Sequence, residues 1–360
     1  MKYVYLLISV LFISCSESIE KKCFIDDKDD IFKGYVEKET YTVKQILDDQ
    51  PDYLEIVNLK RYRTFKKDST EARLFGYSLE EAEKKWKADQ EEFEIFRAKF
   101  SDQFEYSHKQ LLNNVWYALG SNSLGYWLLK IEKGQADAYF LGISFSHYYI
   151  NKVQENPIVK DGFFQAEGSL VKIIKVPGLP GYDDYSAMED GKLFKIKLKD
   201  LMIDSDNDGY NDIFENSLGL NARSNDTDGD GINDFDDMNP MFKSEKNKFS
   251  QLYEMLLPDY GALNFKKLHY SFAVYESDCD YFHQINPGLR VLFIPEKESK
   301  QGYYVRMTDV VGGSISKIKR DKKDPDKFYI YTSGNSFTND YSAEFKNGKW
   351  ILEITGGTVV

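Results

Sequence analysis

Cysteine, histidine and long apolar runs are all scarce in this sequence. There are 3 Cys and 4 His among the 360 residues. So few cysteines do not make a disulfide scaffold, and Cys23 and Cys279 share no spacing motif, so they can pair or remain free thiols. The four histidines form no zinc-binding motif, because they are scattered along the chain. They are His108, His147, His269 and His283.

The common catalytic signatures are absent as well. The sequence has no Gly-x-Ser-x-Gly, no phosphate-binding loop and no His-Glu-x-x-His. We therefore predict no catalytic residues. His147 is the first side chain to inspect, although a hydrogen-bonded structural histidine is the simpler interpretation. A glycosidase that pairs two carboxylates stays open, because the fold alone brings such residues together.

Negative charge is gathered in one stretch. The net charge is −12, and residues 204–237 hold eleven carboxylates against a single arginine, so the rest of the chain is nearly balanced. Nucleic acid is not an expected partner, because its recognition needs clustered lysine and arginine. A divalent cation is the expected partner of this acidic stretch.

The amino terminus has the features of an export signal. Lys2 precedes an apolar run at 3–13, which is too short to cross a bilayer, since a spanning helix needs about 20 residues. The run ends in a sequence that resembles a bacterial lipobox, with Phe12 where Leu is usual. This resemblance implies a signal peptide at 1–14 and lipidation of Cys15. An ordinary cleaved signal with an incidental Cys15 is the alternative.

Residues 15–31 are polar and acidic, so we expect a solvated tether. Their acidic start resembles the export signals of surface-displayed lipoproteins in Bacteroidota. That resemblance implies a location at the outer membrane, on the cell surface or in the periplasm.

The remaining chain predicts an α+β protein with two globular units, at 32–203 and 248–360. Ser78-Leu79-Glu80-Glu81 has the form of a capping box before a helical apolar series. A second helix is expected at 111–119, closed by Gly120, and a third at 249–256.

Strands are expected in both units, and the second unit should be mainly antiparallel. Asn347-Gly348 is a strong hairpin signal near the carboxyl end. The expected strands are 127–131, 136–145, 170–176, 193–198, 272–275, 291–295, 303–307, 316–318 and 328–331.

The strongest pattern lies in the acidic stretch. Calcium takes roughly six to eight oxygen ligands, and alternate carboxylates let one loop wrap one ion. Gly209 at position six permits a sharp turn, and Tyr210 at position seven offers its backbone carbonyl. The carboxylates at positions one, three, five, nine and twelve are Asp204, Asp206, Asp208, Asp212 and Glu215.

The same arrangement repeats 22 residues later, with Gly231 at position six. A solvated run of charge does not place glycine at the sixth position of two phased loops. Magnesium suits the loops less well, because it demands an octahedral shell and keeps its waters. The second set of candidate ligands is Asp226, Asp228, Asp230, the carbonyl of Ile232, Asp234 and Asp237.

Three calcium-binding families use such loops. An EF-hand needs a helix before the loop, whereas residues 193–198 alternate like a strand. A dockerin needs a helix after each loop, and Pro240 prevents one after the second. Residues 204–240 are instead similar to bacterial thrombospondin type 3 repeats, without the cysteines of the animal pattern. The resemblance implies structural calcium.

These features predict a calcium-binding lipoprotein of the cell envelope that acts in surface binding or cell adhesion. Its two units would be joined by a spacer that calcium orders. The expected partners are calcium, the membrane through the lipid anchor, and an extracellular protein or glycan. The alternative is a secreted or surface hydrolase of polysaccharide or peptide, in which the repeats are accessory.

Overall fold

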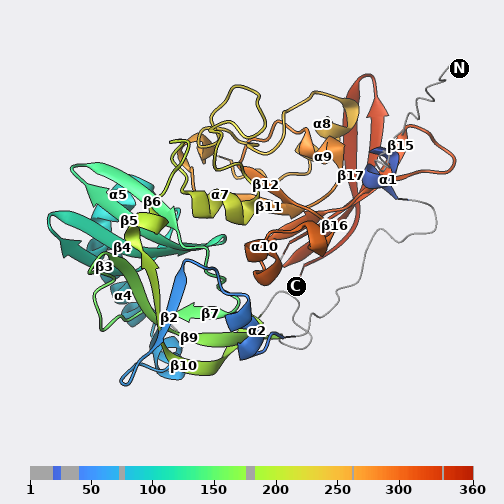
Figure 1. The fold of residues 1–360 in the computed structure, drawn as a ribbon. Helices are drawn as coiled ribbons and strands as arrows, with labels where there is room; N and C mark the ends of the chain where they lie inside the picture. The colour runs from blue at the N-terminus through green and yellow to red at the C-terminus, as the bar shows by residue number, and fades with distance from the viewer. Residues whose placement is uncertain are drawn as a thin grey trace, which may run out of the picture.

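The computed structural model describes residues 19–25, 40–72, 78–175, 183–261, 263–334 and 336–359. The predicted α+β class is confirmed, because helices and strands occur in both halves and the C-terminal region is mainly antiparallel. Figure 1 shows strands β3–β6 at one end of the molecule and β15–β17 at the other. In the ranges described, no helix is both long enough and apolar enough to cross a membrane.

Two antiparallel sheets build the N-terminal unit, which we define as the described residues between 40 and 203. The first is a meander of β3 (Glu105–Leu112), β4 (Val115–Asn122), β5 (Gly125–Glu132) and β6 (Gln135–Phe140). The second runs in the order β2 (Leu54–Asn58), β10 (Asp183–Lys197), β9 (Phe163–Lys175) and β7 (Tyr148–Ile150), with β8 (Val159–Lys160) beside β9.

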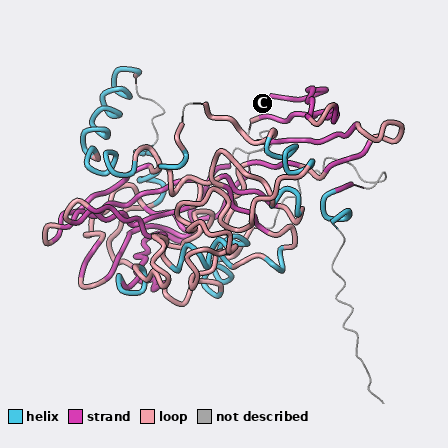
Figure 2. The backbone as a smooth tube through the Cα atoms, turned by 90° about the horizontal axis from the view of Figure 1, so that it is seen from above, coloured by secondary structure: helices cyan, strands magenta, loops and turns pink. Residues whose placement is uncertain are grey.

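Four described helices of this unit precede the meander. The predicted capping box is confirmed at the third, because Ser78 Oγ accepts the Glu81 N–H at 3.2 Å and the Glu81 carboxylate accepts the Ser78 N–H at 2.8 Å. This helix stands at the rim of the molecule (Figure 2) and buries none of its side chains. The helices are α2 (Val43–Asp48), α3 (Phe65–Ala72), α4 (Leu79–Glu92) and α5 (Glu94–Phe100).

The helix expected at 111–119 is wrong. The chain there forms the end of β3 and the start of β4, and Leu112 pairs with Val115. Asn113 and Asn114 make the turn with φ of 51° and 63°. Two successive residues with positive φ match the twist of a hairpin. Asparagine tolerates this conformation, which the apolar spacing did not reveal.

The C-terminal unit comprises residues 248–359 together with 19–25. Its main sheet runs in the order β1 (Phe24–Ile25), β14 (Ile318–Arg320), β15 (Lys327–Gly334), β16 (Phe337–Lys346) and β17 (Lys349–Val359), and β13 (Gly313–Ile315) also pairs with β15. The predicted hairpin at Asn347-Gly348 is confirmed between β16 and β17. A smaller sheet contains β11 (Ala273–Glu276) and β12 (Val291–Ile294).

Two features of this unit differ from the expectation. Strands β11 and β12 pair in parallel. The stretch expected as a strand at 303–307 is helix α10 (Tyr303–Met307), because a short apolar run does not distinguish a strand from a buried helix. The other helices of the unit are α8 (Lys248–Glu254), η1 (Phe265–Lys267), α9 (Asp280–His283) and η2 (Glu298–Lys300).

Part of the expected acidic tether is ordered structure. Helix α1 (Ile19–Cys23) leads into β1, which pairs in parallel with β14. Cys23 is fully buried and forms a disulfide with Cys279. The expectation of a solvated tether is therefore wrong for residues 19–25, which belong to the C-terminal unit.

The buried apolar side chains form two clusters. One contains the core of the N-terminal unit, aromatic residues of the acidic stretch, and residues such as Phe272 and Tyr304. The other lies under the C-terminal sheet and includes Cys23 and Phe24. The acidic stretch thus packs against the rest of the chain through its apolar side chains.

Candidate metal centre

The first acidic loop lies between helices α6 (Leu198–Leu201) and α7 (Asp212–Leu218). Carboxylate oxygens of Asp204, Asp206 and Asp208 lie within 4.8 Å of one another. Gly209 closes the turn with φ of +117°, and its N–H donates to Asp204 Oδ2 at 3.2 Å. The predicted spacing therefore gathers three carboxylates around one point.

Glu215 completes this loop from inside the protein. It sits on α7 and has no exposed surface. One of its carboxylate oxygens lies within 4.8 Å of oxygens of Asp208 and of Asp234 from the second loop. The sequence predicted two separate loops, whereas the structure joins them through this buried group.

Several oxygens of this cluster are buried without a hydrogen-bond donor. Among the described residues, no donor reaches either carboxylate oxygen of Glu215. A buried ionised carboxylate without a partner costs several kcal/mol, so a cation or a proton must compensate it. The other unpartnered oxygens of the loop are Asp204 Oδ1, Asp206 Oδ2 and Asp208 Oδ2.

The pKa values of the cluster reflect burial and the repulsion between its carboxylates. Burial, followed by the charges of Asp206 and Asp208, raises the pKa of Glu215 to about 9. Burial also raises the pKa of Asp208 to about 7, with a smaller contribution from Asp206. A cation held among these oxygens would stabilise their charged forms.

The second loop gathers its own carboxylates. Oxygens of Asp226, Asp228 and Asp230 lie within 4.8 Å of one another. Burial raises the pKa of Asp228 to about 6. Burial also raises the pKa of Asp237, which is 8% exposed, and the nearby negative charge of Asp230 raises it further. Asn239, two residues after Asp237, has a buried Oδ1 with no donor in the described ranges.

The two carboxylates at position nine close their loops. Asp212 accepts hydrogen bonds from the N–H and hydroxyl of Ser205 at 2.8 and 2.7 Å. Asp234 accepts the equivalent pair from Thr227 at 2.8 and 2.6 Å. Both residues tie position two to position nine and so close their loops. The structure does not bring Asp212 into any of the three oxygen groups found among described residues.

The two predicted carbonyl ligands differ in their surroundings. The side chain of Tyr210 is 1% exposed and its hydroxyl donates to the His269 carbonyl at 2.6 Å, whereas Ile232 is 47% exposed. Within the described part of the chain, neither backbone carbonyl accepts a hydrogen bond. Both carbonyls therefore keep their lone pairs for another ligand.

The glycines at position six are not equivalent. A Cβ on Gly209 would lie 3.0 Å from the ring of Phe235, which belongs to the second loop. A Cβ on Gly231 would meet nothing within 4 Å. Gly231 is required only for its φ of +97°, whereas Gly209 also permits the two loops to touch.

The first loop is fixed to the N-terminal unit by Asn211. Its side-chain amide accepts the Phe140 N–H at 3.1 Å, and it donates to the Phe140 carbonyl at 3.0 Å and the Leu201 carbonyl at 2.9 Å. The role of Asn211 was not predicted, because the partner strand end lies 71 residues away.

We expect Asn211→Ala to lower the free energy of unfolding by about 2–4 kcal/mol, because it leaves buried backbone groups without partners. Asn233→Ala is the matched control, since Asn233 occupies the same position of the second loop and its Oδ1 accepts the Phe235 N–H at 3.0 Å. The control should cost less than about 1 kcal/mol. Equal losses in denaturant unfolding would contradict the anchoring role of Asn211.

The second loop is fixed to the C-terminal side of the chain. Phe235 stacks on His269 with ring centroids 4.1 Å apart and an interplanar angle of 5°. The fully buried Arg290 donates to the carbonyl of Asp237. The acidic loops therefore lie between the two units and contact both.

The other candidates are His147, a cavity beside α7, and Cys15. His147 is buried, and burial lowers its pKa to about 4, so the ring is neutral at pH 7. A cavity of about 310 Å³ beside α7 is lined by apolar and polar residues in equal number, and Asp278 supplies its one carboxylate. Cys15, the predicted lipidation site, lies outside the described residues.

Comparison with known proteins adds no relative. No family model, no curated protein and no solved structure matches this chain. Several groups of aspartate and glutamate in the structure can hold a metal ion.

Proposed function

We propose that this protein is a calcium-binding lipoprotein of the bacterial cell envelope, in which calcium orders the segment between two globular units. The observation that carries the proposal is the set of buried carboxylate oxygens without donors around the first loop. Five such oxygens come from Asp204, Asp206, Asp208 and Glu215, and Glu215 supplies two of them. The carbonyl of Tyr210 would be a sixth ligand.

This donor set favours calcium. Calcium accepts roughly six to eight oxygens in flexible geometry and suits a bidentate glutamate at position twelve, whereas magnesium retains several waters. The resemblance of residues 204–240 to thrombospondin type 3 repeats supports the same ion. The donors also exclude a zinc preference, because the group contains no nitrogen or sulfur ligand.

The position of the loops indicates what calcium would do. Asn211 binds the end of β6 on one side, and Arg290 binds the second loop on the other. Calcium would neutralise the carboxylates between these contacts. This would remove the repulsion that opposes packing of the acidic loops between the two units. Calcium would thereby fix the arrangement of the two units, which present a surface to an extracellular protein or glycan.

Two observations support a place in the cell envelope. The lipobox-like end of the apolar run predicts an anchor at Cys15. The Cys23–Cys279 disulfide suits an oxidising compartment, because cytosolic thiols are kept reduced. We place the protein at the outer membrane, facing the periplasm or the cell surface.

The test is calcium binding by the wild-type protein and by Glu215→Gln. Extracellular calcium modules commonly bind at roughly 10⁻⁴–10⁻³ M, so millimolar calcium should raise the unfolding temperature of the wild type. Glu215→Gln removes a bidentate ligand and the cost of keeping an ionisable carboxyl group buried without a partner. It should unfold at a higher temperature than the wild type in chelator, and calcium affinity in calorimetry should fall at least about tenfold.

Asp236→Asn is the matched control, because Asp236 is exposed and lies in the same stretch. It should change neither quantity appreciably. A purely structural Glu215 would instead lower the unfolding temperature of the metal-free variant. No calcium uptake by the wild type in metal analysis, or tighter binding of magnesium than of calcium, would contradict the proposed function.

A further inference from the structure

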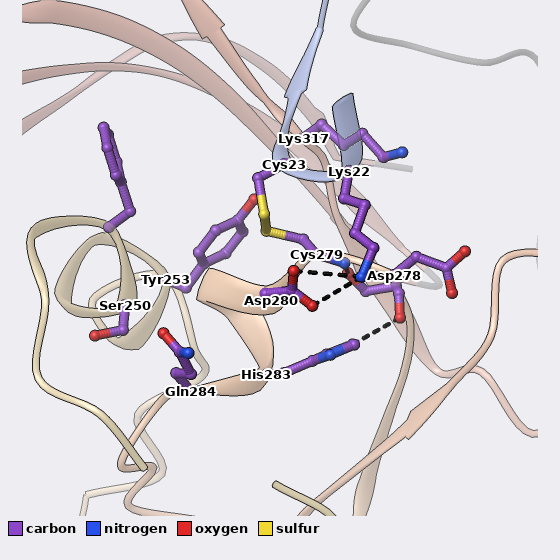
Figure 3. Close-up of a disulfide and its surroundings, with 12 residues drawn as sticks. Lys22, Cys23, Ser250, Tyr253, Asp278, Cys279, Asp280, His283, Gln284 and Lys317 are labelled. Carbon is purple, nitrogen blue, oxygen red and sulfur yellow. Dashed lines mark hydrogen bonds and ion pairs between the residues drawn. A yellow bond between two sulfur atoms is a disulfide. The ribbon is translucent and has the colours of Figure 1, made fainter. Parts of the chain in front are cut away.

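The N-terminal segment is bound to the unit that the C-terminal half of the chain builds. The disulfide joins Cys23 to Cys279, which lies 256 residues away (Figure 3). Next to it the ammonium group of Lys22 lies 3.0 Å from a carboxylate oxygen of Asp280. Both cysteines are almost completely buried. The segment is thus held covalently and cannot leave the C-terminal unit while the disulfide is intact.

Further contacts fix the same segment to the main sheet. Phe24 and Ile25 pair with Ile318 and Lys319 of β14. The Arg320 guanidinium lies 3.8 Å from the ring centroid of Phe24 and pairs with a carboxylate oxygen of Glu20 at 2.8 Å. The direction in which the chain enters the protein is therefore set by the sheet.

The predicted lipidation site is very close to this segment in sequence. Only three residues separate Cys15 from Ile19, the first residue of α1. An extended chain covers at most about 3.6 Å per residue, so the Cα atoms of these two residues lie within about 14 Å of each other. A lipid on Cys15 must then enter the bilayer beside the C-terminal sheet.

We propose that the C-terminal unit of the anchored protein faces the membrane and that the N-terminal unit is held away from it. This inference rests on the lipid anchor of the proposed function. Figures 1 and 2 both place α1 at the end of the molecule that carries the C-terminal sheet, and α4 and α5 at the opposite end. The surface displayed to a partner is therefore that of the N-terminal unit.

The attachment of residues 19–25 to the C-terminal sheet, and not surface charge, determines this orientation. Residues 19–25 and 317–327 together carry eight basic and four acidic side chains. Residues 26–30, which carry four carboxylates and one lysine, follow directly in sequence and oppose attraction to anionic lipid. We accordingly expect the same orientation on neutral and on anionic bilayers.

The test uses the full-length protein, purified in its lipidated form and inserted into vesicles whose headgroups carry a quencher. A fluorophore is attached at Lys323→Cys, in the loop after β14, or at Lys84→Cys, on α4. Both lysines are exposed. Quenching should be severalfold stronger at position 323 than at position 84, on phosphatidylcholine vesicles and on vesicles that also contain phosphatidylglycerol.

The outcomes separate the two proposals. A lipidated protein with equal quenching at both positions, or stronger quenching at position 84, overturns the orientation alone. A mature protein whose mass shows no lipid on Cys15 overturns the anchor and the orientation with it. A contrast that appears only with phosphatidylglycerol shows that charge sets the orientation, which contradicts the inference.

Discussion

In chelator, the unfolding temperature is expected to fall as pH rises from about 5 to about 8, because the folded protein binds more protons than the unfolded chain over this range. The pKa of Glu215 is raised by burial from an ordinary value of 4.5 to about 9. Each pH unit between these values then costs about 1.4 kcal/mol of folding free energy, so three units cost about 4 kcal/mol. Asp208, with a pKa of about 7, adds to the lower part of the range.

Saturating calcium should reverse this dependence. The ion competes with protons for the same oxygens, so its stabilising effect is small near pH 5 and increases as the carboxyl groups ionise. Calorimetric unfolding at several pH values, with calcium and with chelator, measures both curves. Glu215→Gln in chelator should show a shallower fall than the wild type. A stability that rises with pH in chelator would show that the carboxylates have partners that the structure lacks.

The acidic loops were predictable because their chemistry is local. A single short loop that coordinates calcium needs a fixed ligand type and spacing, so alternate carboxylates with glycine at position six indicate candidate ligands from sequence alone. The structure gathers Asp204, Asp206 and Asp208, and separately Asp226, Asp228 and Asp230, as that spacing requires. The capping box at Ser78 and the hairpin at Asn347-Gly348 are local signals of the same kind.

The remaining features depend on contacts that are distant in sequence. The grouping of Glu215 with Asp234 requires the two loops to lie back to back, and no spacing rule encodes that. Asn211 finds its partner in β6, and Cys23 finds Cys279 across most of the chain. The prediction of a spacer ordered by calcium also missed the packing of Tyr210 against Phe214, with ring centroids 4.5 Å apart.

Periodicity misled where a segment was short. The apolar residues at 111–119 satisfy helical spacing, but they lie on two strands joined by a two-asparagine turn. The helix was predicted from the apolar spacing alone, and an asparagine pair is weaker evidence for a hairpin than Asn-Gly. At 303–307 the helix α10 buries Tyr304, whose hydroxyl donates to the carbonyl of Leu124 in the N-terminal unit. Tertiary contacts determined the secondary structure of both segments.

The double variant Cys23→Ser/Cys279→Ser is expected to lose about 3–5 kcal/mol of unfolding free energy. The disulfide closes a loop of 256 residues in the unfolded chain, and long loops give the largest stabilisation in the chain-entropy description. Two buried hydroxyls would also replace sulfur atoms in an apolar cluster. At roughly 2–4 °C per kcal/mol, the unfolding temperature should fall by about 10 °C.

The measurement is calorimetric unfolding of the wild type and of the double variant at saturating calcium, so that the metal contributes equally to both. Cys15→Ser is the control, because it removes the third cysteine without touching the disulfide. Thiol titration of this control in denaturant should find no free thiol before reduction and two after it. Hydrogen exchange should show the loss of protection first in α1 and β1, since Phe24 and the pairing with β14 depend on the covalent link. Two free thiols before reduction, or an unchanged unfolding temperature in the double variant, would show that the N-terminal segment does not need the disulfide to stay on the C-terminal sheet.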